Sequence, residues 1–164
     1  MSQQERLSIG EVVRLATEKI IKGIESLEAR ARWVHVNASD LGPTAACVEL
    51  LRILDTLLQL EYDAVLLVTM YAQRLAERVA ARKLLINADK DVINVYVERG
   101  WATREQAQVA LEALDVEESR LDARYQDYIT QLDDIYQNIE ARLSQALDTV
   151  RGFYSGLGCQ GVLG

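Results

Sequence analysis

The chain has 164 residues, of which 49% are hydrophobic, 26% are charged and one is proline, and its net charge is −7. This balance argues against a disordered chain and indicates one folded domain, in which helices can run long because proline is the strongest helix breaker. Residues 105–150 hold 11 acidic and three basic residues, and so acidic a segment argues against nucleic-acid binding, which needs a basic surface.

The first predicted helix begins after Ser8 and ends near Val36. Ser8 and Glu11 have the spacing of a capping box, in which each side chain binds the backbone N–H of the other residue. Apolar residues then recur in steps of three and four and predict one buried face. They are Ile9, Val13, Ala16, Ile20, Ile24, Leu27, Ala31 and Val34.

The second predicted helix begins at Gly42-Pro43, with proline in the first turn, where its missing N–H costs nothing. No glycine or proline follows before Gly100, so the helix runs to about Ile86 or on to Arg99. A break at the polar stretch 87–89 is one alternative. Residues 92–97 are rich in β-branched side chains and predict a short packed helix, with a strand as the alternative.

Helix two changes character near its middle. Its first half carries a polar row at helical spacing, which consists of Glu49, Arg52, Thr56, Gln59 and Asp63. The row then stops, and residues 64–68 are apolar around the whole circumference, a pattern that normally means burial on all sides. Because few helices of one chain could surround that point, we predict that another subunit covers a face with Leu66, Leu67 and Val68. The alternative is the central helix of a monomeric bundle.

The third predicted helix begins at Thr103, where Thr103 and Gln106 have the spacing of a second capping box. From Arg104 to Arg151 it would be about 72 Å long at about 1.5 Å per residue, and it needs a partner helix of equal length. Its apolar row has mostly heptad steps and places Tyr125 and Tyr128 among packed side chains. The row is Leu121, Tyr125, Tyr128, Leu132, Ile135, Ile139, Leu143, Leu147, Val150 and Tyr154.

The predicted fold class is therefore all-α: an elongated antiparallel helical bundle with long, coiled-coil-like helices over residues 1–151. Residues 152–164 form a glycine-rich, apolar C-terminal tail, whose glycines should stop the helix. The tail carries no charge and alternates small residues with Leu157, Val162 and Leu163. We predict that these three residues dock on the chain's own bundle or on a neighbouring subunit.

Motifs for catalysis are missing from the sequence. The only histidine, His35, has no carboxylate three residues before it, which argues against a di-metal helical site and favours a helix-end or surface histidine. Cys47 and Cys159 are too few for a disulfide framework, so we expect reduced thiols. No nucleophile motif, phosphate-binding loop or dinucleotide fingerprint occurs, and the carboxylates of helix three indicate a solvated face. We predict no catalytic, cofactor-binding or metal-binding residue.

Three arginines, Arg74, Arg78 and Arg82, are spaced four residues apart and form one row on helix two. Pairing with the acidic third helix, within the chain or across an interface, is the favoured interpretation. A solvated face and contact with phosphates are the alternatives.

These features favour a non-catalytic structural protein that self-associates through helix two and the tail, as a component of a filament, a shell or a virion. The alternatives are a helical adaptor or chaperone that binds another protein, and a membrane-active helical protein that exposes residues 64–72. The apolar run is too short to span a bilayer, and the polar N-terminus lacks a signal-peptide core. We therefore expect a protein of the cytoplasm or of an assembled particle, whose partners are copies of itself or other protein subunits.

Overall fold

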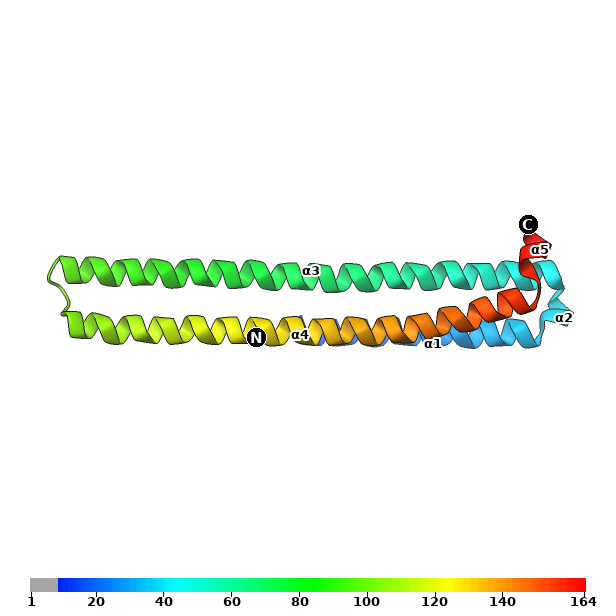
Figure 1. The fold of residues 1–164 in the computed structure, drawn as a ribbon, viewed down its shortest axis with the longest axis horizontal. Coiled ribbons are helices and arrows are strands. Elements are labelled where there is room, and N and C mark those ends of the chain that lie inside the picture. The colour runs from blue at the N-terminus through cyan, green and yellow to red at the C-terminus, as the bar shows by residue number, and fades with distance from the viewer. Residues whose placement is uncertain (1–8) are drawn as a thin grey trace, which may run out of the picture. The chain divides into compact units, whose positions relative to one another are not determined.

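The computed structural model describes residues 9–164, and the part of the chain it describes is helical, without a strand. The all-α prediction is confirmed. The elements are α1 (Ile9–Val36), α2 (Ala38–Leu41), α3 (Pro43–Glu98), α4 (Arg104–Gly156) and α5 (Cys159–Leu163), as Figure 1 shows. Ser8 lies outside the described residues, and so does the capping box predicted for it.

The chain forms two compact units, and α3 and α4 each contribute to both. The first, called the bundle unit, comprises residues up to Val68 and residues from Asp134 onward. It contains α1, α2, the first part of α3, the last part of α4, and α5. The second, called the hairpin unit, comprises Thr69–Asp133, which is the rest of α3, the connecting loop and the start of α4.

The core of the bundle unit is built from three helices and closed by α5. The predicted row of α1 is buried or half-buried wherever it is described, from Val13 to Val34, as predicted. It packs against one face of α3 and one face of α4. The fully enclosed side chains include Ile24, Val34, Leu50, Leu57, Ile139, Leu143 and Val150.

A short connection reverses the chain between α1 and α3. The first helix ends at Val36, as predicted, and the side-chain amide of Asn37 donates to the carbonyl of Trp33 at 2.8 Å. One turn of helix, α2, follows. Gly42 then has a φ of +87°, a conformation open to glycine, and Pro43 is the first residue of α3.

Helix α3 continues without a break through Glu98, over 56 residues. The predicted break at 87–89 does not occur, and the strand alternative for 92–97 is wrong. Ile93 and Val97 are half-buried on the same face of the helix as the buried Leu75 and Ile86. Burial of this row outweighs the modest β-preference of the branched residues.

The hairpin turn is defined by two local motifs. Gly100 has a φ of +72°; its N–H donates to Val97, and the N–H of Trp101 donates to Tyr96, which is the Schellman pattern. Thr103 and Gln106 then form the predicted capping box: the Thr103 N–H donates to Oε1 at 3.1 Å, and the Gln106 N–H donates to Oγ1 at 3.2 Å.

Helix α4 differs from the prediction at two points. It does not stop at Arg151 but continues through Gly152 to Gly156, so the predicted helix end is wrong. Phe153 and Tyr154 pack against the core there, and this burial offsets the low helix propensity of glycine. Tyr128 is exposed, and Ile129 takes the half-buried position that the sequence row had assigned to the tyrosine.

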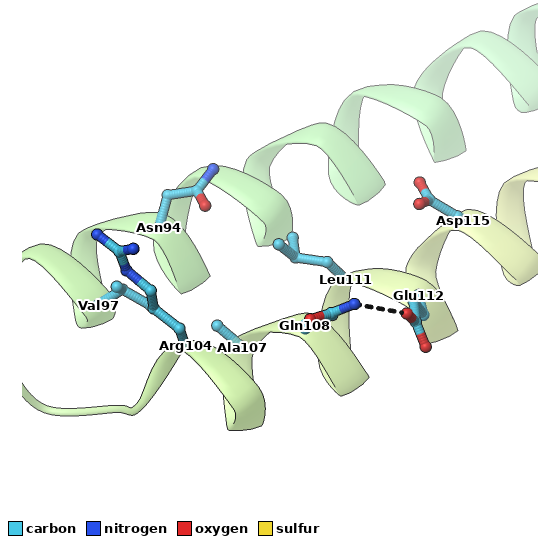
Figure 2. Close-up of a pocket in the computed structure, with 8 residues that line it drawn as sticks. All are labelled: Asn94, Val97, Arg104, Ala107, Gln108, Leu111, Glu112 and Asp115. Carbon is cyan, nitrogen blue, oxygen red and sulfur yellow. Dashed lines mark hydrogen bonds between the residues drawn. The ribbon is translucent and has the colours of Figure 1, made fainter.

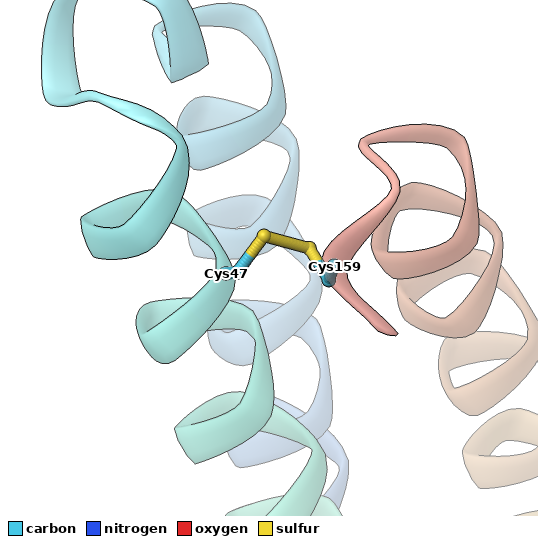
Figure 3. The surroundings of a disulfide bond; sticks show 2 residues. All are labelled: Cys47 and Cys159. Atoms are coloured by element: carbon cyan, nitrogen blue, oxygen red, sulfur yellow. A yellow bond between two sulfur atoms is a disulfide. The ribbon is translucent and has the colours of Figure 1, made fainter. Parts of the chain in front are cut away.

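A disulfide joins Cys47 near the start of α3 to Cys159 at the start of α5 (Figure 3). Both residues are buried, and 112 residues separate them in the sequence. The prediction of reduced, unpaired thiols is therefore wrong for this structure. The bond holds α5 against the first turns of α3, where Leu157 also packs on the core.

Candidate functional site

His35 and the acidic residues do not form a metal-binding site in the described part of the chain. The His35 ring stacks on Phe153 of α4, with ring centroids 4.3 Å apart and planes inclined by 14°. Among residues 9–164, no three His, Cys, Asp or Glu side chains lie close enough to hold a metal ion. Over the same residues, no helix is long and apolar enough to cross a membrane.

A groove of about 360 Å³ lies between α3 and α4 in the hairpin unit (Figure 2). Its polar side chains interact with one another and with neighbouring residues rather than converging on one point. The Gln108 amide donates to Glu112 at 3.2 Å, and Asp115 accepts from the Lys90 ammonium at 2.7 Å. The lining residues are Asn94, Val97, Arg104, Ala107, Gln108, Leu111, Glu112 and Asp115. They contain no serine, cysteine or histidine, and their two carboxylates, Glu112 and Asp115, already bind neighbouring side chains.

Basic residues of α3 pair with acidic residues of α4 in the hairpin unit. Arg82 binds Glu117. Lys83 lies 2.7 Å from Asp122, and Lys90 lies 2.7 Å from Asp115 and 3.1 Å from Glu118. Hydrogen bonds to these carboxylates raise the pKa of Lys83 and the pKa of Lys90.

The other two residues of the arginine row lie differently. Arg74 and Arg78 are exposed and form no ion pair with the residues that the structure describes. Lys83 and Lys90, which sequence reasoning missed, contact α4 instead. They are seven residues apart on the face of α3 beside Ile86, and this spacing relative to the apolar row was the signal that could have identified them.

A buried carboxylate links α1 to α4 inside the bundle unit. Glu28 is 4% exposed and lies 2.8 Å from Arg32 and 2.6 Å from Arg142. Sequence reasoning missed this pair, although Glu28 lies within one turn of the buried Ile24 and Ala31 of the apolar row. On the same helix as Arg142, burial raises the pKa of Tyr136, and the carboxylates of Glu140 and Glu61 raise it further.

The outward face of α3 in the bundle unit carries an apolar row that the other described helices leave exposed. Leu58 is 46% exposed and Tyr62 is 61% exposed, and Leu51, Val65 and Leu66 lie on the same side of the helix. The polar row predicted from Glu49 to Asp63 runs beside it. At the edge of this polar row, hydrogen bonds from Arg30 and Arg52 to Glu49 lower the pKa of that carboxyl.

The six residues predicted for self-association do not form one cluster. Leu66 is exposed, Leu67 and Val68 are half-buried, and only Ala64 of that run is fully enclosed. In the tail, Leu157 packs on the core, whereas Val162 and Leu163 are exposed on α5. Because α5 is fixed at Cys47, it lies about 28 Å along α3 from Leu66, at about 1.5 Å per residue.

Comparison with known proteins finds no matching family model, no similar curated protein and no similar solved structure. Function is therefore inferred from the chain's own surfaces. The most distinctive of these is the row of Leu51, Leu58, Tyr62, Val65 and Leu66, called here the bundle row. Such contiguous apolar exposure marks interaction sites more often than isolated surface leucines do.

Proposed function

We propose that this chain is a non-catalytic structural subunit that self-associates, with the bundle row as one of its contact surfaces. Long helices, two of them over 50 residues, provide extended surfaces for packing against other copies. A filament, a shell or a virion component is the kind of assembly that fits such a subunit. Val162 and Leu163 on the disulfide-held α5 provide a second small apolar patch near the start of α3.

The observation that carries the proposal is the position of the bundle row relative to the core. Leu50 and Leu57 already bury one face of α3, and Leu51 and Leu58 repeat the same spacing one residue later on the outward side. A helix with apolar rows on two faces is typical of one that has neighbours on both sides. The chain's described helices cover only one of these faces.

The energetic case depends on the area that remains exposed. Complete burial of a leucine or valine side chain contributes about 1.5–3 kcal/mol, and side chains already half-covered contribute about half of that. Four or five such residues would contribute several kcal/mol before the entropy of association is subtracted, and this cost is of similar size. The proposal therefore predicts an association that depends on concentration.

A pair of matched double variants tests the bundle row. Leu58→Glu with Tyr62→Glu places two charges in the row and should lower the mass measured by light scattering at a fixed concentration. Thr56→Glu with Gln59→Glu places the same charges on the neighbouring polar row and should leave the mass unchanged. All four side chains are exposed, so both variants should keep the helicity seen by circular dichroism. Equal masses for the two variants would contradict the assignment of this face.

A second candidate function, a helical adaptor, is favoured by one observation at the tip of the hairpin. Trp101 is 64% exposed, packs edge-on against Tyr96 and lies under the guanidinium of Arg99. Tryptophan and arginine are enriched among the residues that dominate binding energy at protein interfaces. An adaptor should be a monomer on its own at every concentration, and this result would put the adaptor function first.

A further inference from the structure

Helix α5 lies on the same side of α3 as the bundle row. On an α-helix, positions that are 7, 11 and 18 residues after a given residue fall on one line along the surface, because these spacings are close to whole turns. One such line on α3 consists of Cys47, Leu54, Leu58 and Val65. The last two residues belong to the bundle row. The disulfide places α5 against the first residue of the line, Cys47 (Figure 3).

Exposure along this line is lowest beside α5. Cys47 is 0% exposed and Leu54 is half-buried, whereas Leu58 and Val65 are 46% and 41% exposed. Leu51 of the bundle row, one turn after Cys47, is also exposed. Helix α5 therefore occupies the place where another helix, packed along the bundle row, would reach the first turns of α3.

The disulfide is the main link between α5 and α3. The backbone N–H groups of Gly161 and Val162 donate to the carbonyl of Gly158, within the segment itself and not to α3. Residues 157–164 carry no charged side chain, so no side-chain ion pair can join them to another helix. Leu157 is the residue of this segment, beside the cysteine, that packs against the core. Without the bond, this small contact would have to hold a helix of five residues, which is too short to form on its own in water.

Reduction of the bond by a dithiol is a thiol–disulfide exchange. One thiolate of the dithiol attacks a sulfur of the Cys47–Cys159 bond and forms a mixed disulfide, and the other cysteine leaves as a thiolate that takes up a proton. The second thiolate of the dithiol then displaces the remaining cysteine in the same way. The dithiol loses two electrons and ends as a cyclic disulfide, and Cys47 and Cys159 end as thiols.

We propose that α5 is a redox-controlled cover over the first position of the bundle row. While the bond is intact, α5 blocks a helix of a second copy from packing along the row beyond Leu51. Reduction by a dithiol releases α5, so that a second copy packs along α3 from its first turns and self-association becomes stronger. The inference rests on the proposed function and adds the regulation of its contact surface.

The reactivity of the Cys47 thiol tests the release of α5 without depending on self-association. Cys159→Ser leaves Cys47 as the one thiol of the full chain, and iodoacetamide should alkylate it rapidly under native conditions, as mass spectrometry measures. The control is Ala64→Cys in a chain with Cys47→Ser and Cys159→Ser. Ala64 is 1% exposed and lies about 26 Å along α3 from Cys47, at about 1.5 Å per residue, so its thiol should stay protected. Equal rates at the two positions, whether fast or slow, would overturn the local release of α5.

Light scattering on oxidised and reduced protein tests the effect on association. Val162→Ser with Leu163→Ser removes the exposed apolar side chains of α5, so any change on reduction then comes from the uncovered row. The reduced form of this variant should reach half-association at a concentration about tenfold lower than the oxidised form, the change that burial of one further apolar side chain gives. Adding Leu58→Glu and Tyr62→Glu should abolish the difference. Identical curves for the oxidised and reduced forms would overturn the cover.

The two proposals fail in different ways. If the unmodified chain keeps the mass of one chain in both redox states while the Cys47 thiol of Cys159→Ser reacts rapidly, the release of α5 stands and self-association fails. If the chain self-associates equally in both states, or if the Cys47 thiol stays protected, the proposed function stands and only the redox-controlled cover fails.

Discussion

Gly100 closes α3 in a backbone conformation that side chains other than glycine rarely adopt. With a φ of +72° it occupies the position after the helix end in a Schellman motif, and Tyr96 and Trp101 make the apolar contact that accompanies this motif. The residue therefore determines where α3 stops and how the chain turns into α4. Nothing lies within 4 Å of the place where a Cβ would stand, so the cost of substitution comes from the backbone alone.

We predict that Gly100→Ala lowers the free energy of unfolding by about 1–2 kcal/mol, the cost of a left-handed conformation for an L-residue. Gly152→Ala is the control. Gly152 lies inside α4 with open space around it, so alanine should raise stability by about 0.5–1 kcal/mol. Urea denaturation followed by circular dichroism measures both changes. A destabilising effect of the same size at both positions would contradict the conformational explanation.

At the scale of the elements, the least expected is α5, which has five residues. A helix this short does not form on its own in water, because the free-energy cost of nucleating a helix exceeds the stabilisation that one turn of hydrogen bonds provides. The Cys47–Cys159 bond and the packing of Leu157 hold it in place. Closing a loop of about 100 residues by a disulfide contributes up to about 4–5 kcal/mol in the chain-entropy description.

We therefore predict that Cys159→Ser lowers the thermal midpoint and exposes residues 157–163 to rapid hydrogen exchange. Cys47→Ser should have the same effect, and the double variant should add little, because both single changes remove one bond. Reduction of the unmodified chain should reproduce the result. If exchange in the tail is as slow in the variants as in the oxidised chain, α5 is held by packing alone.

The elements also differ in how far sequence predicts them. The end of α1 at Val36 and the start of α4 after Thr103 were predictable, because turn residues and a capping box are local signals. The end of α4 was not, because Gly152 reads as a stop until Phe153 and Tyr154 are seen to pack on the core. Tyr128 and Ile129 are adjacent in a row where steps of three and four both fit, so spacing alone could not assign the inward side chain.

The candidate surfaces likewise combine features that the sequence predicts with features that depend on tertiary contacts. Leu66 was a predicted contact residue and is exposed, but sequence did not separate it from Leu67 and Val68, which turn partly inward. The pairing of Cys47 with Cys159 and the ion pair of Glu28 with Arg142 depend on tertiary contacts, which spacing does not contain.

At the scale of the whole molecule, charge is arranged so that an acidic α4 meets basic residues of α3. Lys83, Lys90 and Tyr136 all have a pKa raised above the ordinary value in the folded chain. A raised pKa means that the protonated form is favoured by folding. The contribution of each such group to stability is fully present below the group's pKa in the unfolded chain. It is lost as the pH rises through the group's pKa in the folded chain.

We therefore predict a thermal midpoint that declines as the pH rises above about 10, where lysine and tyrosine side chains begin to lose their protons. Lys83→Gln with Lys90→Gln should lower the midpoint at neutral pH and make the alkaline decline shallower. Calorimetry across the pH range measures both. An alkaline decline of the same steepness in the variant would contradict the role given to the two lysines.

The bundle row and the patch of Val162 and Leu163 on α5 would give each copy contacts with more than one neighbour. Subunits with two distinct contacts can form open-ended assemblies, whereas a single two-fold contact stops at a dimer.

The most direct test of self-association is the mass of the unmodified, oxidised chain, measured by multi-angle light scattering over a concentration series. One chain has a mass of 18.4 kDa. We predict a mass of at least two chains that increases with concentration. A constant mass of one chain at every concentration would contradict the account and leave the adaptor function as the better explanation of the exposed apolar surfaces.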